Sequence, residues 1–278
     1  MSQPLLLLIP LATPFVAALM ALCLPSKARN AAAALAWFTA LVGMGCLVAL
    51  FSAVDSNDPV RFSLAWLPSL GVNFTLRLDG LSWLFAFMVQ GIGALVVLYA
   101  RYYMSADDPV PRFFAFLLAF MGAMTGLVMS GDLIQMAVFW EMTSLFSFLL
   151  IGYWHHNSAA RDGARMALTV TAAGGLCLFA GVIVLGRIAG SFDLDVVLGS
   201  GAAIKNSPLY LPALLLILAG ALTKSAQFPF HFWLPRAMAA PTPCQCLSAL
   251  GHHGKSGHFP ADPFLASFGG HRRLVFPA

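Results

Sequence analysis

The sequence predicts an all-α, polytopic membrane helix bundle of about seven transmembrane helices, the seventh of them broken. Of the 278 residues, 60% are hydrophobic and only 9% are charged, and the mean hydropathy is +0.84. So few charges cannot cover the surface of a soluble globule of this size. Glu141 and Lys224 nevertheless lie in the middle of long apolar stretches. A charge at the bilayer centre costs roughly 2.5–3.5 kcal/mol and is usually functional, which indicates ion or proton handling.

Seven apolar segments come close to the ~20 residues that a spanning helix needs. They cover residues 4–24, 31–53, 80–100, 113–130, 133–154, 166–186 and 209–234. No Lys or Arg precedes the first segment and a second span follows at once, so we expect a retained helix rather than a signal peptide. Pro10 and Pro14 are expected to bend this helix. The connection 54–79 alternates around Gly71 and could form a β-hairpin on the membrane surface.

The distribution of basic residues predicts the orientation. The net charge of +4 would suggest nucleic acid in a soluble protein, but here Lys and Arg fall mainly in short connections, so no nucleic-acid partner is expected. If the spans alternate, the connections on one side of the membrane hold four basic residues. Those on the opposite side hold seven: Lys27, Arg29, Arg101, Arg112, Arg161, Arg165 and Arg236. The positive-inside rule then places the N-terminus outside the cytoplasm.

The fifth span contains the first candidate site residue. Asp132 stands where the helix is expected to begin, near the positive end of its dipole. Glu141 follows about two turns later, beside Thr143, Ser144 and Ser147, whose hydroxyls could bind a carboxylate or relay a proton through water. An intramembrane carboxyl is functional by default, although a protonated Glu141 could instead lock two helices together.

The seventh span contains Lys224. Pro229 is expected to interrupt this helix and Pro235 to end it. A proline frees carbonyls in the preceding turn, and in transporters such broken helices line the ion path. A lysine here whose distance to Glu141 changes could take up and release a proton, whereas the alternative is snorkelling to the surface. His231 could titrate near neutral pH, or belong to an aromatic belt with its neighbours; both interpretations stay open.

At these positions the sequence resembles a known family. The segments that carry the resemblance are FWEMTS at 139–144, FLLIGYW at 148–154, TKSAQFPFHFWLP at 223–235 and AMAAPTP at 237–243. They are similar to the large A subunit of multisubunit cation/proton antiporters of the Mrp or Pha type, which is homologous to the antiporter-like proton-pumping subunits of respiratory complex I. The complex I proteins have a less aromatic run in place of Phe-His-Phe-Trp, so the antiporter branch fits better.

The resemblance implies specific roles. Glu141 corresponds to the family's fifth-helix glutamate and Lys224 to its seventh-helix lysine, the pair thought to gate proton movement. The expected function is Na⁺ or K⁺ exchange for protons with other antiporter subunits, in a bacterial cell membrane and without a cofactor. The chain is thus expected to be a transporter subunit rather than an enzyme. Arg236 departs from the family, in which many relatives have an acidic or small residue.

The resemblance extends from about residue 1 to 243 and then stops. Residues 244–278 are rich in Gly, His and Pro and lack the eighth helix, where the family has a histidine and a further lysine. Synonymous codons can be chosen for residues 244–258 so that translation one nucleotide later gives VSAYLHSATMVKAGI. This is the sequence that the family would place there. We therefore expect a frameshift, in the gene or in the sequence record, and a disordered tail.

The cysteines predict neither disulfides nor a metal site. Cys23, Cys46 and Cys177 lie within apolar runs, where a lone cysteine is usually a packing residue. The tail offers Cys and His in a spacing that matches no common zinc pattern, and the frame interpretation explains them without metal: Cys244, Cys246, His252, His253 and His258. Two alternative functions stay open: a proton-pumping membrane subunit of NADH:quinone oxidoreductase, and an inactive assembly remnant.

Overall fold

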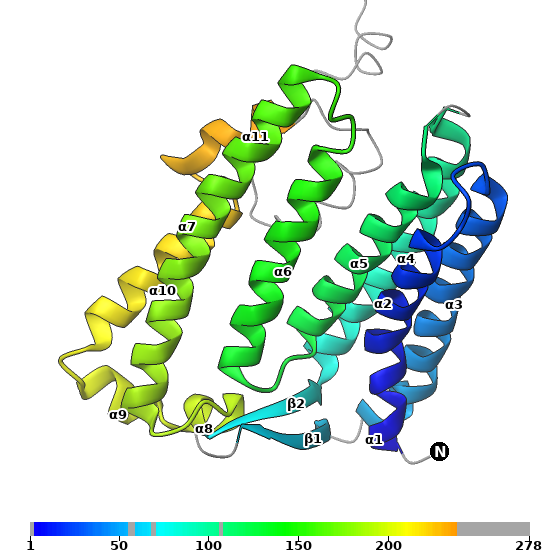
Figure 1. Ribbon diagram of the computed structural model, residues 1–278. Helices are drawn as coiled ribbons and strands as arrows, with labels where there is room; N and C mark the ends of the chain where they lie inside the picture. Colours follow the sequence, from blue (N-terminus) through cyan, green and yellow to red (C-terminus); the bar gives the residue numbers. More distant parts are fainter. Residues whose placement is uncertain (1–2, 55–58, 68–70, 106–107, 238–278) are drawn as a thin grey trace, which may run out of the picture.

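The computed structural model describes residues 3–54, 59–67, 71–105 and 108–237 (Figure 1). The predicted tail, 244–278, and its Cys and His residues lie outside the described residues. The described part is helical apart from one hairpin. Its helices are α1 (Gln3–Leu6), α2 (Leu8–Leu22), α3 (Arg29–Val54), α4 (Gly80–Tyr103), α5 (Val110–Val128), α6 (Leu133–Ile151), α7 (Ser158–Ala189), α8 (Leu194–Gly199), α9 (Gly201–Asn206), α10 (Tyr210–Lys224) and α11 (Trp233–Ala237), with a 3₁₀ turn at Phe230–Phe232.

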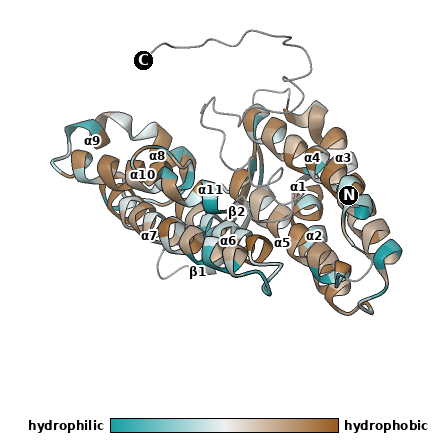
Figure 2. Cartoon of the chain, turned by 90° about the horizontal axis from the view of Figure 1, so that it is seen from above, coloured by the Kyte–Doolittle hydropathy of each residue, from teal (hydrophilic) through white to brown (hydrophobic). Residues whose placement is uncertain are grey.

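The helices confirm a multi-pass membrane protein. Among the described residues, five helices are long and apolar enough to span a bilayer: α3, α4, α5, α6 and α7. The shorter apolar helices α2 and α10 account for the first and seventh predicted spans. Hydrophobic residues dominate these helices (Figure 2).

Helix α5 forms the centre of the bundle. Within its most apolar window, 83% of the residues are buried, and α5 packs against α2, α3, α4 and α6 (Figure 1). A helix that is apolar on all sides is expected to be surrounded by other helices. The side chains of Phe113, Phe114, Leu117 and Leu118 are fully buried.

The first predicted span is interrupted at Leu7, between α1 and α2, and Pro14 lies inside α2. Because proline has no N–H, the carbonyl of Pro10 loses its helical hydrogen bond. Gln90 of α4 replaces this donor: its side chain is fully buried, and its Nε2 donates to Pro10 O and to Thr125 Oγ1, both at 3.2 Å. A buried amide of α4 therefore compensates for a proline in α2, as the cost of unpaired polar groups in lipid requires.

The predicted hairpin is confirmed. Strands β1 (Val60–Leu67) and β2 (Val72–Leu78) pair antiparallel, and Gly71 in the turn has a φ of +67°. Backbone hydrogen bonds then join three segments: Gly131 N donates to Thr75 O at 2.8 Å, and Leu194 N donates to Gly131 O at 2.9 Å. The two long connections of the chain therefore meet at the start of α6, at one end of the bundle (Figure 1).

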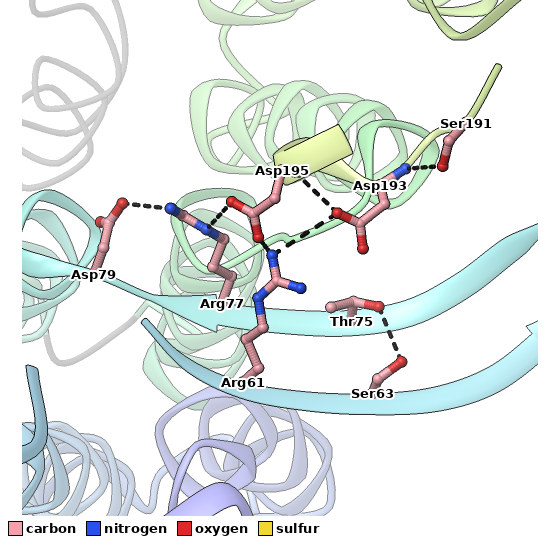
Figure 3. A network of polar contacts seen from close by, with 8 residues as sticks. All are labelled: Arg61, Ser63, Thr75, Arg77, Asp79, Ser191, Asp193 and Asp195. Atoms are coloured by element: carbon pink, nitrogen blue, oxygen red, sulfur yellow. Dashed lines mark hydrogen bonds and ion pairs between the residues drawn. The ribbon is translucent and has the colours of Figure 1, made fainter. Parts of the chain in front are cut away.

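Charged side chains reinforce this junction. Figure 3 shows Asp195 between Arg77 and Arg61, with Arg77 Nε 3.0 Å from Asp195 Oδ1. Arg77 also contacts Asp79, which accepts the N–H of Ser82 at 2.8 Å and caps α4. Burial opposes ionisation of Asp79, but the hydrogen bonds from Ser82 and Arg77 outweigh it, so the pKa of this carboxyl lies below its usual value.

Candidate functional site

Asp132 caps α6 as predicted. Its Oδ1 accepts the N–H groups of Ile134 at 2.8 Å and Gln135 at 3.2 Å, and the residue is buried. Burial raises the pKa of the Asp132 carboxyl above its usual value, although these amide hydrogen bonds lower it. Glu141 lies about 13 Å further along the helix axis, at 1.5 Å per residue. The structure therefore places Asp132 at the helix start and does not bring it to Lys224.

Lys224 is buried at the last turn of α10, with 7% of its surface exposed. Its Nζ donates hydrogen bonds to Thr143 Oγ1 and Ser144 Oγ of α6, both at 2.8 Å, and lies 5.6 Å from the centre of the Trp140 ring. Hydroxyl oxygens and an aromatic face both stabilise a cation away from water. Lys224 thus does not snorkel, and two of the three hydroxyls predicted beside Glu141, those of Thr143 and Ser144, bind the lysine.

Glu141 faces a different helix. The site that a Cβ would occupy at Gly175 of α7 overlaps the Glu141 carboxyl group. Glu141 Oε1 is buried and has no hydrogen-bond partner, and no ion pair joins Glu141 to Lys224 within the described residues. In this state the acid and the base are neighbours on α6 and α10 without being paired.

Two consecutive glycines of α7 allow these contacts. A Cβ at Gly174 would overlap the side chain of Thr223, the residue before Lys224, while Gly175 faces Glu141. Helices that pack in a bilayer commonly approach through such small residues. Helix α7 therefore lies close to Glu141 and to Thr223, the residue before Lys224, through its bare backbone.

The seventh span breaks earlier than Pro229. Helix α10 ends at Lys224, and Ala226 adopts a positive φ of +49°. The carbonyls at the break are satisfied: Leu222 O accepts Gln227 N at 3.1 Å, and Thr223 O accepts the indole Nε1 of Trp233 at 3.1 Å. Trp233 is buried, so it closes the break rather than standing at the bilayer surface. The break forms one wall of the site.

A cavity of about 20 Å³ adjoins Lys224. Its polar lining comes from Ser144, Ser147, Thr171 and Lys224, and Trp233 lies among its apolar walls. A space of this size accommodates about one water molecule when several polar groups line it. Ser147 therefore lines the same cavity as Lys224.

His231 lies elsewhere. Its side chain is exposed, and its ring stacks on Phe228 with 6.0 Å between ring centres. It is not among the residues that line the Lys224 cavity. Its place in a proton path therefore stays a prediction. Within the described ranges, no group of three or more His, Cys, Asp or Glu side chains could hold a metal ion.

Sequence reasoning missed the α7 side of the site. Gly174 and Gly175 follow two alanines, and this run of small residues signals close helix packing. Thr171 lines the cavity one turn earlier and carries no such signal. The sequence indicated Trp233 only as part of an aromatic belt and not as the hydrogen-bond donor to Thr223 O.

Two family models match this chain. Residues 130–251 match "NADH:quinone oxidoreductase/Mrp antiporter, TM", and residues 66–114 match "NADH-Ubiquinone oxidoreductase (complex I), chain 5 N-terminus". The two ranges together cover more than half of the chain. The first range contains both Glu141 and Lys224.

Similar proteins agree with these matches. A probable K⁺/H⁺ antiporter A/B subunit of Rhizobium meliloti is 57% identical over 88% of this chain and 25% of the relative. The Na⁺/H⁺ antiporter A subunit of Alkalihalophilus pseudofirmus is 46% identical over 69% of this chain and 24% of the relative. The chain thus spans about a quarter of the length of these curated relatives.

Solved structures share the fold. The Mrp complex from Dietzia sp. DQ12-45-1b contains a chain that aligns with a TM-score of 0.76 and 33% identity, over 88% of this chain and 26% of that chain. An archaeal membrane-bound sulfane sulfur reductase aligns with a TM-score of 0.72 and 21% identity, which shows the fold alone.

The matched family models and the shared fold place this membrane bundle in the class of antiporter-like membrane subunits. Within that class, the chain belongs to the A-subunit family of Mrp-type cation/proton antiporters.

Proposed function

We propose that this chain forms the N-terminal part of an antiporter A subunit, in which it carries protons near the bilayer centre through Glu141 and Lys224. The observation that supports this most strongly is the buried Lys224 ammonium, which donates to Thr143 and Ser144 at 2.8 Å beside a small polar cavity. A fixed structural lysine needs no such cavity. A lysine that exchanges a proton needs both stabilisation of its charge and contact with a proton carrier.

The hydroxyls suit both states of the lysine. Thr143 Oγ1 donates to Trp140 O at 2.7 Å and accepts from Lys224, so it stabilises the ammonium form. A hydroxyl both donates and accepts, so Ser144 could also donate to a neutral amine after rotation. Because Glu141 and Lys224 are unpaired, transfer between them requires a water molecule or a side-chain movement. The cavity beside Ser144 and Ser147 provides room for a water molecule next to Lys224. Glu141 does not line this cavity, so a movement of its side chain is needed to reach that water.

We propose that cation exchange occurs in the assembled complex with other antiporter subunits. Of the two relatives described above, the more similar is named for K⁺ and the other for Na⁺. A complex I type proton pump is the second candidate, because one matched model is described for complex I chain 5. An inactive assembly remnant is the third.

Everted vesicles test this proposal. The complete A subunit, co-expressed with its partner subunits in an antiporter-deficient bacterium, should collapse a preformed pH gradient when K⁺ or Na⁺ is added. A pH gradient that changes on addition of NADH and quinone, but not on addition of K⁺ or Na⁺, would favour the complex I interpretation. Assembly of the complex without any cation response would favour the remnant.

The boundary after Pro243 is part of the same proposal. The matched family model runs to residue 251, eight residues beyond that boundary. Sequencing the genomic DNA around codon 244 would test the proposed change of reading frame.

The orientation makes a further testable prediction. Arg161 and Arg187 lie near opposite ends of α7, so they should face opposite sides of the membrane. In a cysteine-free background, Arg161→Cys should react with an impermeant maleimide only from the cytoplasmic side. Arg187→Cys is the matched control and should react from outside in sealed cells. Outside labelling of the Arg161→Cys variant would invert the predicted topology.

A further inference from the structure

The Glu141 carboxyl group occupies space that any side chain at position 175 would fill. A Cβ built on Gly175 overlaps both Oε1 and the carboxyl carbon of Glu141. Oε1 is excluded from solvent and has no hydrogen-bond partner among the described residues. This oxygen therefore lies against the α7 backbone without a polar partner among the described residues.

The neighbouring glycine makes a parallel contact. Gly174 leaves room for Thr223, whose Oγ1 donates to Gly220 O at 2.8 Å directly before Lys224. Helix α7 thus lies against Glu141 from α6 and against the last turn of α10. Two adjacent glycines leave the space that the acid and the segment carrying the base occupy.

We propose that Gly175 is a positioning residue that keeps the Glu141 carboxyl group on α7 and out of a closed ion pair with Lys224; this rests on the proposed function. In a low-dielectric interior, a closed pair of opposite charges attracts strongly and would hold both groups in place. Thr143 and Ser144 already bind the ammonium group. An open arrangement leaves each group able to change its protonation state separately.

A double-mutant cycle tests the contact in the 278-residue chain. Gly175→Ala should lower the unfolding temperature of the detergent-solubilised protein, because the new methyl group displaces the carboxyl group. In the Glu141→Ala background the same substitution should not lower the unfolding temperature, since the carboxyl group is absent. Gly45→Ala in α3 is the matched control, because its Cβ would meet no atom within 4 Å. An equal loss of stability in both backgrounds would overturn the proposal.

A transport measurement tests the positioning role. In the complete A subunit, Gly175→Ala should reduce the exchange rate by up to about 10²-fold, as misplacement of a reacting group by ~1 Å can do. Adding Glu141→Asp should restore part of the rate, because its carboxyl group is one methylene shorter. A purely structural role of Gly175 would give no such rescue.

The outcomes separate this inference from the proposed function. If Gly175→Ala transports normally while Glu141→Ala is inactive, Gly175 has no positioning role and the proposed function stands. If Glu141→Ala transports normally, the proposed function fails, and the stability cycle alone still reports whether Gly175 holds the carboxyl group.

Discussion

Glu141→Ala and Lys224→Ala should each abolish cation-dependent proton exchange by the complete A subunit while leaving membrane insertion intact. Both side chains lie within apolar spans, and their removal relieves the cost of a charge in the bilayer, so the helices should still insert. Losing a general acid or base typically costs 10²–10⁴-fold in rate, which places the remaining exchange below about 1%. The pH gradient across everted vesicles measures the rate, and immunoblots of the membrane fraction measure insertion.

Two control variants make this result specific to proton transfer. Lys224→Arg keeps a positive charge, but arginine stays protonated in proteins, so this variant should also be inactive. Lys205→Ala removes a basic residue of α9 that lies far along the chain from the site, and it should exchange normally. Wild-type exchange by either Ala variant at positions 141 or 224 would remove that residue from the mechanism.

The sequence predicts the spans well because hydropathy and length determine insertion. The hairpin is also readable, since Gly71 supplies the positive φ that its turn adopts. The exact helix ends are less predictable. Pro229 suggested the position of the break, but α10 already ends at Lys224, where Trp233 supplies a hydrogen bond to Thr223 O from ten residues further along. A contact of this kind depends on the packed tertiary structure.

The candidate site was predictable in composition but not in geometry. A charge at membrane depth marks Glu141 and Lys224 without any structure. Which side chain meets the lysine depends on the rotation of α6 about its own axis, and this rotation depends on tertiary packing. Helical periodicity makes Glu141 and Ser144, three residues apart, neighbours on one side of α6, so sequence alone does not choose between them. The structure assigns Ser144 to the lysine and Glu141 to α7.

The hydroxyl partners of Lys224 lead to the second large prediction. Thr143→Val combined with Ser144→Ala should destabilise the protein by at least about 1–3 kcal/mol, the cost of leaving a buried donor without its partner, which is larger for a charged group. Both hydrogen bonds to Lys224 Nζ disappear, and only the Trp140 ring remains beside the ammonium among the contacts described. Thermal or denaturant unfolding in detergent measures the loss. Thr169→Val is the matched control, because Thr169 is exposed and bonds only its own helix.

Adding Lys224→Met to that double variant should restore most of the lost stability. Methionine fills a similar volume without a charge, so valine and alanine at positions 143 and 144 then face an apolar neighbour. The triple variant should still be inactive in exchange, which would separate the stability of the fold from its function. If the double variant is as stable as the wild type, the hydroxyls do not bind the lysine in the membrane protein. If Lys224→Met fails to restore stability, the two hydroxyls stabilise α6 through contacts other than those with Lys224.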